Sequence, residues 1–158
     1  MYCKTCDKDK QPKEYRKHRL VCKKCENKQT IKKRKERIEK GLCSYCSANK
    51  LSDSRLCLNH FFYFSMNYSF KSSKKHADKL KAIWEKQDRR CVYTDIPLIP
   101  GVNLGFDHIK SRARYPELAT NYDNIQCVDR RINTMKNSLD HDEFVSLCQK
   151  VMEKYLGT

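Results

Sequence analysis

Glycine, proline and long apolar runs are scarce in this chain of 158 residues, which holds four glycines, four prolines and one tryptophan. Its apolar runs are far shorter than the roughly 20 residues that cross a bilayer, so we expect no transmembrane helix. The first ten residues, MYCKTCDKDK, lack the apolar core of a secretory signal, and we therefore expect a protein that is not secreted. A chain of this length forms one or two small domains, which excludes a large enzyme core.

Acidic residues are also few beside the basic ones. The sequence has 34 Lys and Arg against 19 Asp and Glu, a formal net charge of +15, which makes an anionic partner the leading expectation. Residues 1–60 hold 18 basic and 7 acidic residues, a net of +11, whereas residues 61–158 hold 16 and 12, a net of +4. This asymmetry predicts an N-terminal binding half (1–60) and a C-terminal half (61–158) with a different task.

Cysteine, in contrast, is abundant, and seven of the ten cysteines lie before residue 60. In a reducing compartment such cysteines bind metal more often than they form disulfides. The first set of ligands is Cys3, Cys6, Cys22 and Cys25, and the second is Cys43, Cys46, Cys57 and His60. Each set completes a tetrahedron and leaves no open position, so we expect two structural zinc ions. His60 could instead belong to the aromatic cluster that follows it, but its spacing after Cys57 favours a ligand.

A basic segment joins the two sets of ligands. Residues 26–40 (ENKQTIKKRKERIEK) lack Gly and Pro, Ile31 and Ile38 fall on one face, and Gly41 follows as a stop signal, so the segment is predicted to be a helix. Such a helix is either a solvated connecting rod or a surface that contacts phosphates. Its candidate phosphate contacts are Lys32, Lys33, Arg34, Lys35 and Arg37.

The second half of the chain begins with a segment rich in aromatic residues. Six of the fifteen Phe and Tyr lie between Phe61 and Phe70, where they could stack on single-stranded bases but are better explained as core. His18 and His76 lack ligand spacing, and we expect both at the surface.

The rest of the second half mixes short strands with helices. We expect helices over 76–88, over 128–136 and from Asp140 onward, and strands over 91–94 and 102–109. Glu143 follows Asp140 at the spacing of a capping box. The last helix has a mostly apolar face, which we expect to supply packing.

Three polar residues in this half have chemistry that fits together. Asp107 and Asn133 offer oxygen atoms of the kind that Mg²⁺ prefers, and they leave most of its shell to water and phosphate. His108, beside Asp107, can take a proton from water near neutral pH. Together these groups describe metal-assisted attack of water on a phosphodiester.

At this point the sequence resembles the HNH, or ββα-metal, nuclease family, over roughly residues 91–145. The resemblance is carried by FDHI, by NIQ, and by Asn133 and Lys136 at family spacing after Asn124. It implies an α+β nuclease unit in which His108 is the general base and Asn124 braces the loop and orients that histidine. It further implies that Asp107 and Asn133 bind one catalytic Mg²⁺ or Mn²⁺, and that the products carry 5′-phosphate and 3′-hydroxyl ends.

The chain departs from this family at one place. Many members hold a further zinc with two CxxC pairs, but here the first pair is Cys91 and Thr94 and the second falls at Asp129 and Ile132. We therefore expect no third zinc.

Zinc knuckles followed by a basic helix and an HNH motif resemble small phage-encoded or restriction-type HNH endonucleases. The resemblance implies two zinc modules (1–60) that bind double-stranded DNA, a nuclease domain with an aromatic-rich lead-in (61–158), and a cytoplasmic location in a bacterial or phage-infected cell. The further candidate phosphate contacts are Arg112, Arg114, Arg130, Arg131 and Lys136. A homodimer and an RNA substrate remain open, and the competing function is a zinc-stabilised nucleic-acid-binding protein without cleavage activity.

Overall fold

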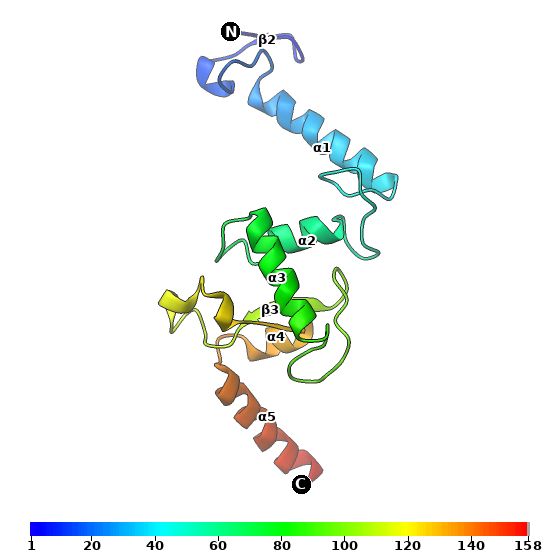
Figure 1. Cartoon of the computed structure of the whole chain (residues 1–158). Coiled ribbons are helices and arrows are strands. Elements are labelled where there is room, and N and C mark those ends of the chain that lie inside the picture. Colours follow the sequence, from blue (N-terminus) through cyan, green and yellow to red (C-terminus); the bar gives the residue numbers. More distant parts are fainter. Residues whose placement is uncertain (158) are drawn as a thin grey trace. The chain divides into compact units, whose positions relative to one another are not determined.

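The computed structural model describes residues 1–157, and its architecture is mixed α+β (Figure 1). The chain forms two compact units: the first holds residues 1–50 and 55–57, and the second holds residues 51–54 and the chain from Leu58 onward. Within the described residues, every helix is too short or too polar to cross a membrane.

The first unit is built around a small hairpin and one long helix. Strands β1 (Tyr2–Cys3) and β2 (Lys8–Asp9) pair antiparallel, a 3-10 turn follows at Pro12–Glu14, and helix α1 spans Lys23–Glu39. The predicted basic helix is thus confirmed. It begins three residues earlier than expected because Cys22 takes the N-cap position, which places the Cys25 side chain in the first helical turn.

The second unit begins with two helices that carry the aromatic core. Helix α2 spans Leu58–Phe64 and helix α3 spans Lys74–Lys86. The ring of Phe62 lies 5.8 Å from that of Trp84 and 6.0 Å from that of Phe106. The buried side chains of this core include Phe61, Phe62, Met66, Phe70, Leu80 and Trp84. The assignment of the aromatic segment to the core is therefore confirmed for Phe61, Phe62 and Phe70. Tyr63 and Phe64 are only partly buried, and the assignment is wrong for Tyr68, which is exposed.

The prediction that His76 lies at the surface is wrong. Its side chain is buried, and its Nδ1 lies 2.9 Å from the Tyr122 hydroxyl while its Nε2 lies 2.7 Å from the carbonyl oxygen of Ser65. Its ring stacks on Phe70 at 5.0 Å. His76 therefore ties the aromatic segment to the chain near residue 122. His18 is exposed, as expected.

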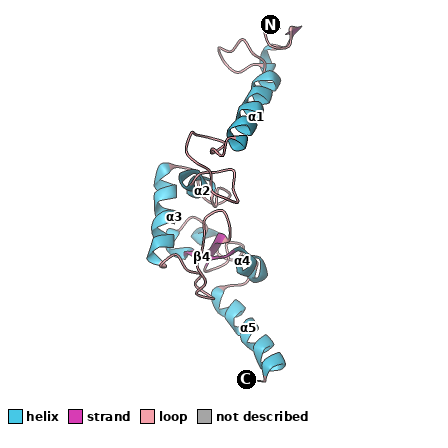
Figure 2. Ribbon diagram, turned by 90° about the vertical axis from the view of Figure 1, so that its right-hand side faces the viewer, coloured by secondary structure: helices cyan, strands magenta, loops and turns pink. Residues whose placement is uncertain are grey.

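One antiparallel strand pair and a short helix form the centre of the second unit. Strand β3 (Leu104–His108) pairs with β4 (Ile125–Asp129) so that Asp107 lies opposite Gln126, and α4 (Arg130–Lys136) follows at once. Both α3 and α4 contact the strands, as Figure 2 shows. The fold therefore sets Asp107 and His108, at the end of β3, against the helix that carries Asn133.

The strand predicted over 91–94 is absent. Those residues form a turn, in which the Asp95 amide donates to the carbonyl of Cys91. The true partner strand, β4, was missed because all five of its side chains are buried, which removes the apolar–polar alternation that marks a half-exposed strand. Asp129, predicted to lie inside the helix over 128–136, is instead the N-cap of α4.

The last helix, α5 (His141–Leu156), starts with the predicted capping box of Asp140 and Glu143. Its expected packing role is only partly met, because Phe144 is its one buried residue among those described. Beyond Phe144, Val145 and Cys148 are partly buried, whereas the other apolar side chains are about half-exposed or more: Leu147, Val151, Met152, Tyr155 and Leu156.

Candidate functional site

The first cysteine set meets in space. The sulfur atoms of Cys3, Cys6, Cys22 and Cys25 all lie within 4.8 Å of one another. Around a tetrahedral zinc with bonds of about 2.3 Å, such sulfurs stand about 3.8 Å apart, so small adjustments suffice to close the shell. The Cys22 amide donates to the sulfur of Cys3 at 3.2 Å, and this bond lowers the pKa of Cys3 to about 6. Burial raises the pKa of Cys25 to about 12, and a hydrogen bond with Cys3 raises the pKa of Cys6, so before zinc binds it is Cys3 whose thiolate form the fold favours.

The second set meets in the same way. The ligand atoms of Cys43, Cys46, Cys57 and His60 lie within 4.8 Å of one another, and the sulfurs of Cys46 and Cys57 are 3.7 Å apart. The His60 ring also stacks on Phe64 at 5.9 Å, so it belongs to the aromatic cluster as well as to the ligand set. The two sets are consistent with two structural zinc ions.

A polar cleft of about 240 Å³ gathers most of the residues singled out in the second half. Asp107 and His108 reach it from the end of β3, Asn133 and Lys136 from α4, and Arg112 from the loop between the strands. The other residues that line it are Tyr68, Phe106, Ser111, Ala113, Asn137 and Ser138. Three of the four predicted catalytic or metal-binding residues therefore share one cleft.

His108 is held in a defined orientation at the edge of this cleft. Its Nε2 lies 3.0 Å from the carbonyl oxygen of Ala119, which can only accept, so Nε2 carries the proton. In the neutral imidazole, Nδ1 is then the acceptor, and it has no protein partner among the described residues. This is the tautomer that a general base needs.

Asn124 lies outside the cleft and holds the loop that supports His108. Its amide oxygen accepts from the Lys110 amide at 2.8 Å, and its amide nitrogen donates to the Lys110 carbonyl at 3.0 Å and to the Leu118 carbonyl at 3.4 Å. Ala119, which bonds His108, is the next residue of that loop. Asn124 is thus placed to position the histidine through the backbone.

Asp107 is buried and already has a cation beside it. Lys136, which is 1% exposed, lies with its Nζ 3.1 Å from Oδ2 of Asp107 and donates to the His108 carbonyl at 2.9 Å. Gln126 also donates to Asp107, at 3.0 Å. A carboxylate has about four lone-pair sites, so Asp107 can still bind a metal ion. Lys136 itself is a buried partner of Asp107, not an exposed cation.

Asn133 offers the second oxygen. Its amide nitrogen donates to the Phe106 carbonyl at 3.3 Å, which leaves its amide oxygen without a protein partner in the described part of the chain. With Asp107, it gives the cleft two hard oxygen groups, a donor set that suits Mg²⁺ or Mn²⁺ with water completing the shell.

Tyr68 is a cleft residue that the sequence did not single out. The guanidinium of Arg112 lies 4.4 Å from the centre of its ring, and Tyr68 is 58% exposed although Phe70, close to it in the chain, is buried. An exposed ring under an arginine offers a flat surface and a positive charge beside Asp107 and His108. The only feature of the sequence that could have pointed to Tyr68 is its position near the end of the aromatic segment, where the neighbouring residues are polar.

The other predicted arginines of this half are held by protein groups. Arg114 donates to both carboxylate oxygens of Glu143 at 2.7 Å, Arg130 donates to the Leu104 carbonyl at 3.1 Å, and Arg131 pairs with Asp129 at 3.0 Å. These hydrogen bonds fix the orientation of the three side chains. Of the four arginines predicted in this half, only Arg112 lines the cleft.

In the first unit, two arginines of α1, Arg34 and Arg37, contact the second cysteine loop. The Arg34 guanidinium lies 4.4 Å from the centre of the Tyr45 ring, and Arg37 donates to the Ser44 carbonyl at 3.3 Å. Arg34, Lys35, Tyr45 and Arg55 share a hollow of about 360 Å³ whose remaining lining is Ile31, Ile38 and Ser44. Lys32 and Lys33 are exposed on the same helix. This face therefore combines positive charge with an exposed aromatic ring.

Comparison with protein-family models, with curated proteins and with solved structures found no match to this chain. The proposed function therefore rests on the residues themselves and on their geometry.

Proposed function

We propose that this protein is a metal-dependent DNA endonuclease of the HNH type. The observation that carries the proposal is the cleft in which Asp107, His108 and Asn133 meet, with Nδ1 of His108 left as a free acceptor. These are the groups needed to deprotonate a water molecule and to bind a divalent ion beside a phosphate.

The chain's own residues have distinct tasks in this scheme. His108 takes the proton of the attacking water at Nδ1, while the Ala119 carbonyl keeps the ring in place and stabilises the cation that forms. Asn124 positions the loop that carries Ala119. When bound, a divalent ion held by Asp107 and Asn133 supplies positive charge to the scissile phosphate and the leaving 3′ oxygen.

Substrate binding draws on the exposed cations. Arg112 lies at the cleft, and the cations of α1 add a second positive surface in the first unit. Lys and Arg that neutralise phosphates release counterions, so this arrangement favours DNA affinity that falls steeply with salt.

A second candidate is a zinc-stabilised nucleic-acid-binding protein without cleavage activity. The ion pair of Lys136 and Asp107 favours it, because the carboxylate that would bind the metal ion is already neutralised by a buried ammonium group. In that case the cleft needs no divalent ion to be stable.

Replacement of His108 by Ala separates the two candidates. For an endonuclease, the variant binds duplex DNA as tightly as the wild type but cleaves it at least about 100-fold more slowly, the usual contribution of a general base. The matched control is His18→Ala, which removes an exposed histidine of the first unit and leaves both properties unchanged. Absence of cleavage by the folded wild type on varied DNA would favour the binding protein.

A further inference from the structure

Gln126 carries a buried amide that faces Asp107 across the strand pair. The two residues are cross-strand partners in β3 and β4, and Gln126 is 5% exposed. Its Nε2 lies 3.0 Å from Oδ2 of Asp107 and 2.9 Å from the hydroxyl oxygen of Tyr93. An ionised carboxylate can only accept, so the amide nitrogen faces Asp107, and its two hydrogens account for both contacts. Gln126 therefore holds Asp107 from the side of β4.

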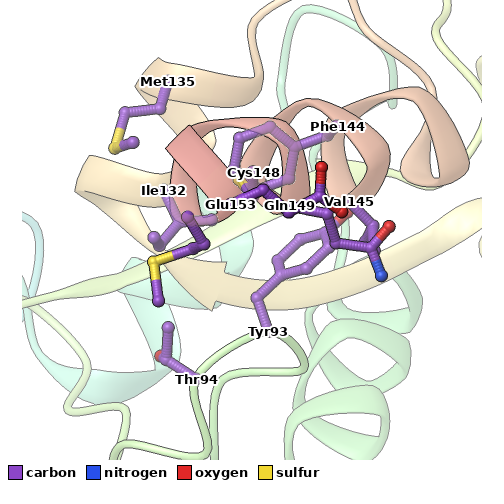
Figure 3. Close-up of a pocket in the computed structure, with 10 residues that line it drawn as sticks. Tyr93, Thr94, Ile132, Met135, Phe144, Val145, Cys148, Gln149 and Glu153 are labelled. Carbon is purple, nitrogen blue, oxygen red and sulfur yellow. The ribbon is translucent and has the colours of Figure 1, made fainter. Parts of the chain in front are cut away.

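The Tyr93 hydroxyl, which accepts the second of these bonds, is itself held in place. It lies 3.1 Å from Nδ1 of His141, and the Tyr93 ring stacks on the His141 ring at 5.1 Å and meets the Phe144 ring edge-on at 5.2 Å. Figure 3 shows the Tyr93 side chain reaching from its turn toward α5. Burial raises the pKa of Tyr93 to about 12, so its hydroxyl stays neutral at neutral pH. No negative charge therefore arises beside the amide that holds Asp107.

The turn that carries this tyrosine is anchored on β4, beside Gln126. The Val92 amide donates to the Cys127 carbonyl at 3.3 Å, and the Asp129 amide donates to the sulfur of Cys91 at 3.4 Å. A glutamine side chain has several rotatable bonds and loses conformational entropy when it is fixed. Because the turn and β4 are bonded together, the tyrosine hydroxyl stands at a fixed place and can hold the Gln126 amide in one orientation.

We propose that Gln126 and Tyr93 are positioning residues that hold Asp107 in the orientation that binds the divalent ion. Lys136 donates to the carboxylate from α4 and Gln126 from β4, so two donors fix its rotation while Asp107 still lines the cleft. Loss of such a hydrogen-bond partner of a metal ligand costs about 10–100-fold in metal affinity or activity. The inference rests on the metal site of the proposed function.

Strand pairing alone does not require an amide at this position. The neighbouring Ile125, Cys127 and Val128 are apolar and buried, and another apolar side chain would be buried there without the cost of removing an amide from water. The amide of Gln126 is instead satisfied by Asp107 and by a hydroxyl. Its presence in β4 is therefore explained by the carboxylate that it holds.

Electron paramagnetic resonance of Mn²⁺ added to the zinc-loaded full chain, without DNA, tests the proposal. The wild type is expected to bind Mn²⁺ at a site that Asp107→Asn removes. Gln126→Met keeps the length of the side chain but removes the donor, and it should weaken this binding at least about tenfold. Tyr93→Phe removes only the hydroxyl and should weaken it at least about threefold. Because Tyr93 acts through Gln126, Tyr93→Phe should cause no further loss in the Gln126→Met protein.

Tyr122→Phe is the matched control, because it also removes a hydroxyl of the second unit that lies 2.9 Å from a histidine Nδ1, that of His76. It should bind Mn²⁺ like the wild type, and circular dichroism verifies that every variant is folded. Unchanged Mn²⁺ affinity in Gln126→Met or Tyr93→Phe, or losses that add in the double variant, would overturn the proposal and leave the metal site standing. A wild type that binds no Mn²⁺ would overturn it together with that metal site, so the two failures are distinguishable.

Discussion

The ion pair of Lys136 and Asp107 should dominate the stability of the cleft. Lys136 is 1% exposed and Asp107 is 6% exposed, and their charged atoms are 3.1 Å apart. Lys136→Met keeps a flexible chain of similar length but removes the charge. The change leaves the carboxylate of Asp107 buried with Gln126 as its remaining side-chain donor.

The size of the effect follows from the geometry. At 3.1 Å and an effective dielectric constant of about 20, the attraction between the two charges is about 5 kcal/mol. Desolvation of both groups offsets part of it, and removal of one partner from a buried pair costs about 3–5 kcal/mol. We therefore expect Lys136→Met to lower the free energy of unfolding by about 3 kcal/mol. Asp107→Asn in the same chain should recover part of this loss, because no unpaired charge then remains.

Urea unfolding followed by circular dichroism measures these values for the wild type, both single variants and the double variant. A coupling free energy of about 1–3 kcal/mol between the two positions is expected. Added Mg²⁺ should stabilise Lys136→Met more than the wild type if Asp107 binds the ion. A Lys136→Met variant within about 0.5 kcal/mol of the wild type, or strictly additive losses in the double variant, would refute this view of the cleft.

Three further predictions concern the metal sets, the acid sensitivity and the basic helix. Native mass spectrometry should find two zinc ions per chain, and Cys25→Ser should reduce this to one; an unchanged count would contradict the first ligand set. The Arg131 guanidinium hydrogen-bonds Asp129 and lowers its pKa, so the stabilisation by Asp129 is complete above its unfolded pKa of about 3.9 and is lost as the pH falls through the lower folded value. The melting temperature of the wild type should therefore decrease as the pH falls below about 4, and it should decrease less for Asp129→Asn. If the melting temperatures of the two proteins depend on pH in the same way, this role of Asp129 is contradicted. Arg34→Gln should weaken DNA binding and reduce the slope of its salt dependence by about 1 in fluorescence anisotropy, whereas Lys150→Gln on α5 should change neither.

The sequence was sufficient where the signal is local. The spacing of Cys3, Cys6, Cys22 and Cys25 predicts a ligand set because each CxxC pair already brings two sulfurs together, and the structure adds only the meeting of two pairs. Helix α1 and the capping box of α5 depend on neighbouring residues in the same way.

The sequence was insufficient where a residue's environment comes from distant parts of the chain. His76 lacked any local sign of burial, because its partner Tyr122 lies 46 residues away. The burial of Lys136 depends on the register of α4 against β3, and the fully buried strand β4 shows no alternation. The exposure of α5 could not be foreseen either, because an apolar helix face looks the same whether it covers a core or a partner.

Cleavage of supercoiled plasmid tests the proposed endonuclease most directly. Zinc-loaded wild type and His108→Ala are compared with Mg²⁺ or Mn²⁺, without either ion, and with EDTA, and the products are treated with DNA ligase. We predict relaxation or linearisation by the wild type only when Mg²⁺ or Mn²⁺ is present, with ends that ligase can rejoin because they carry 5′-phosphate and 3′-hydroxyl groups. Equal cleavage by His108→Ala, or intact plasmid after treatment with folded wild type and either ion, would contradict the assignment of the cleft as a nuclease site.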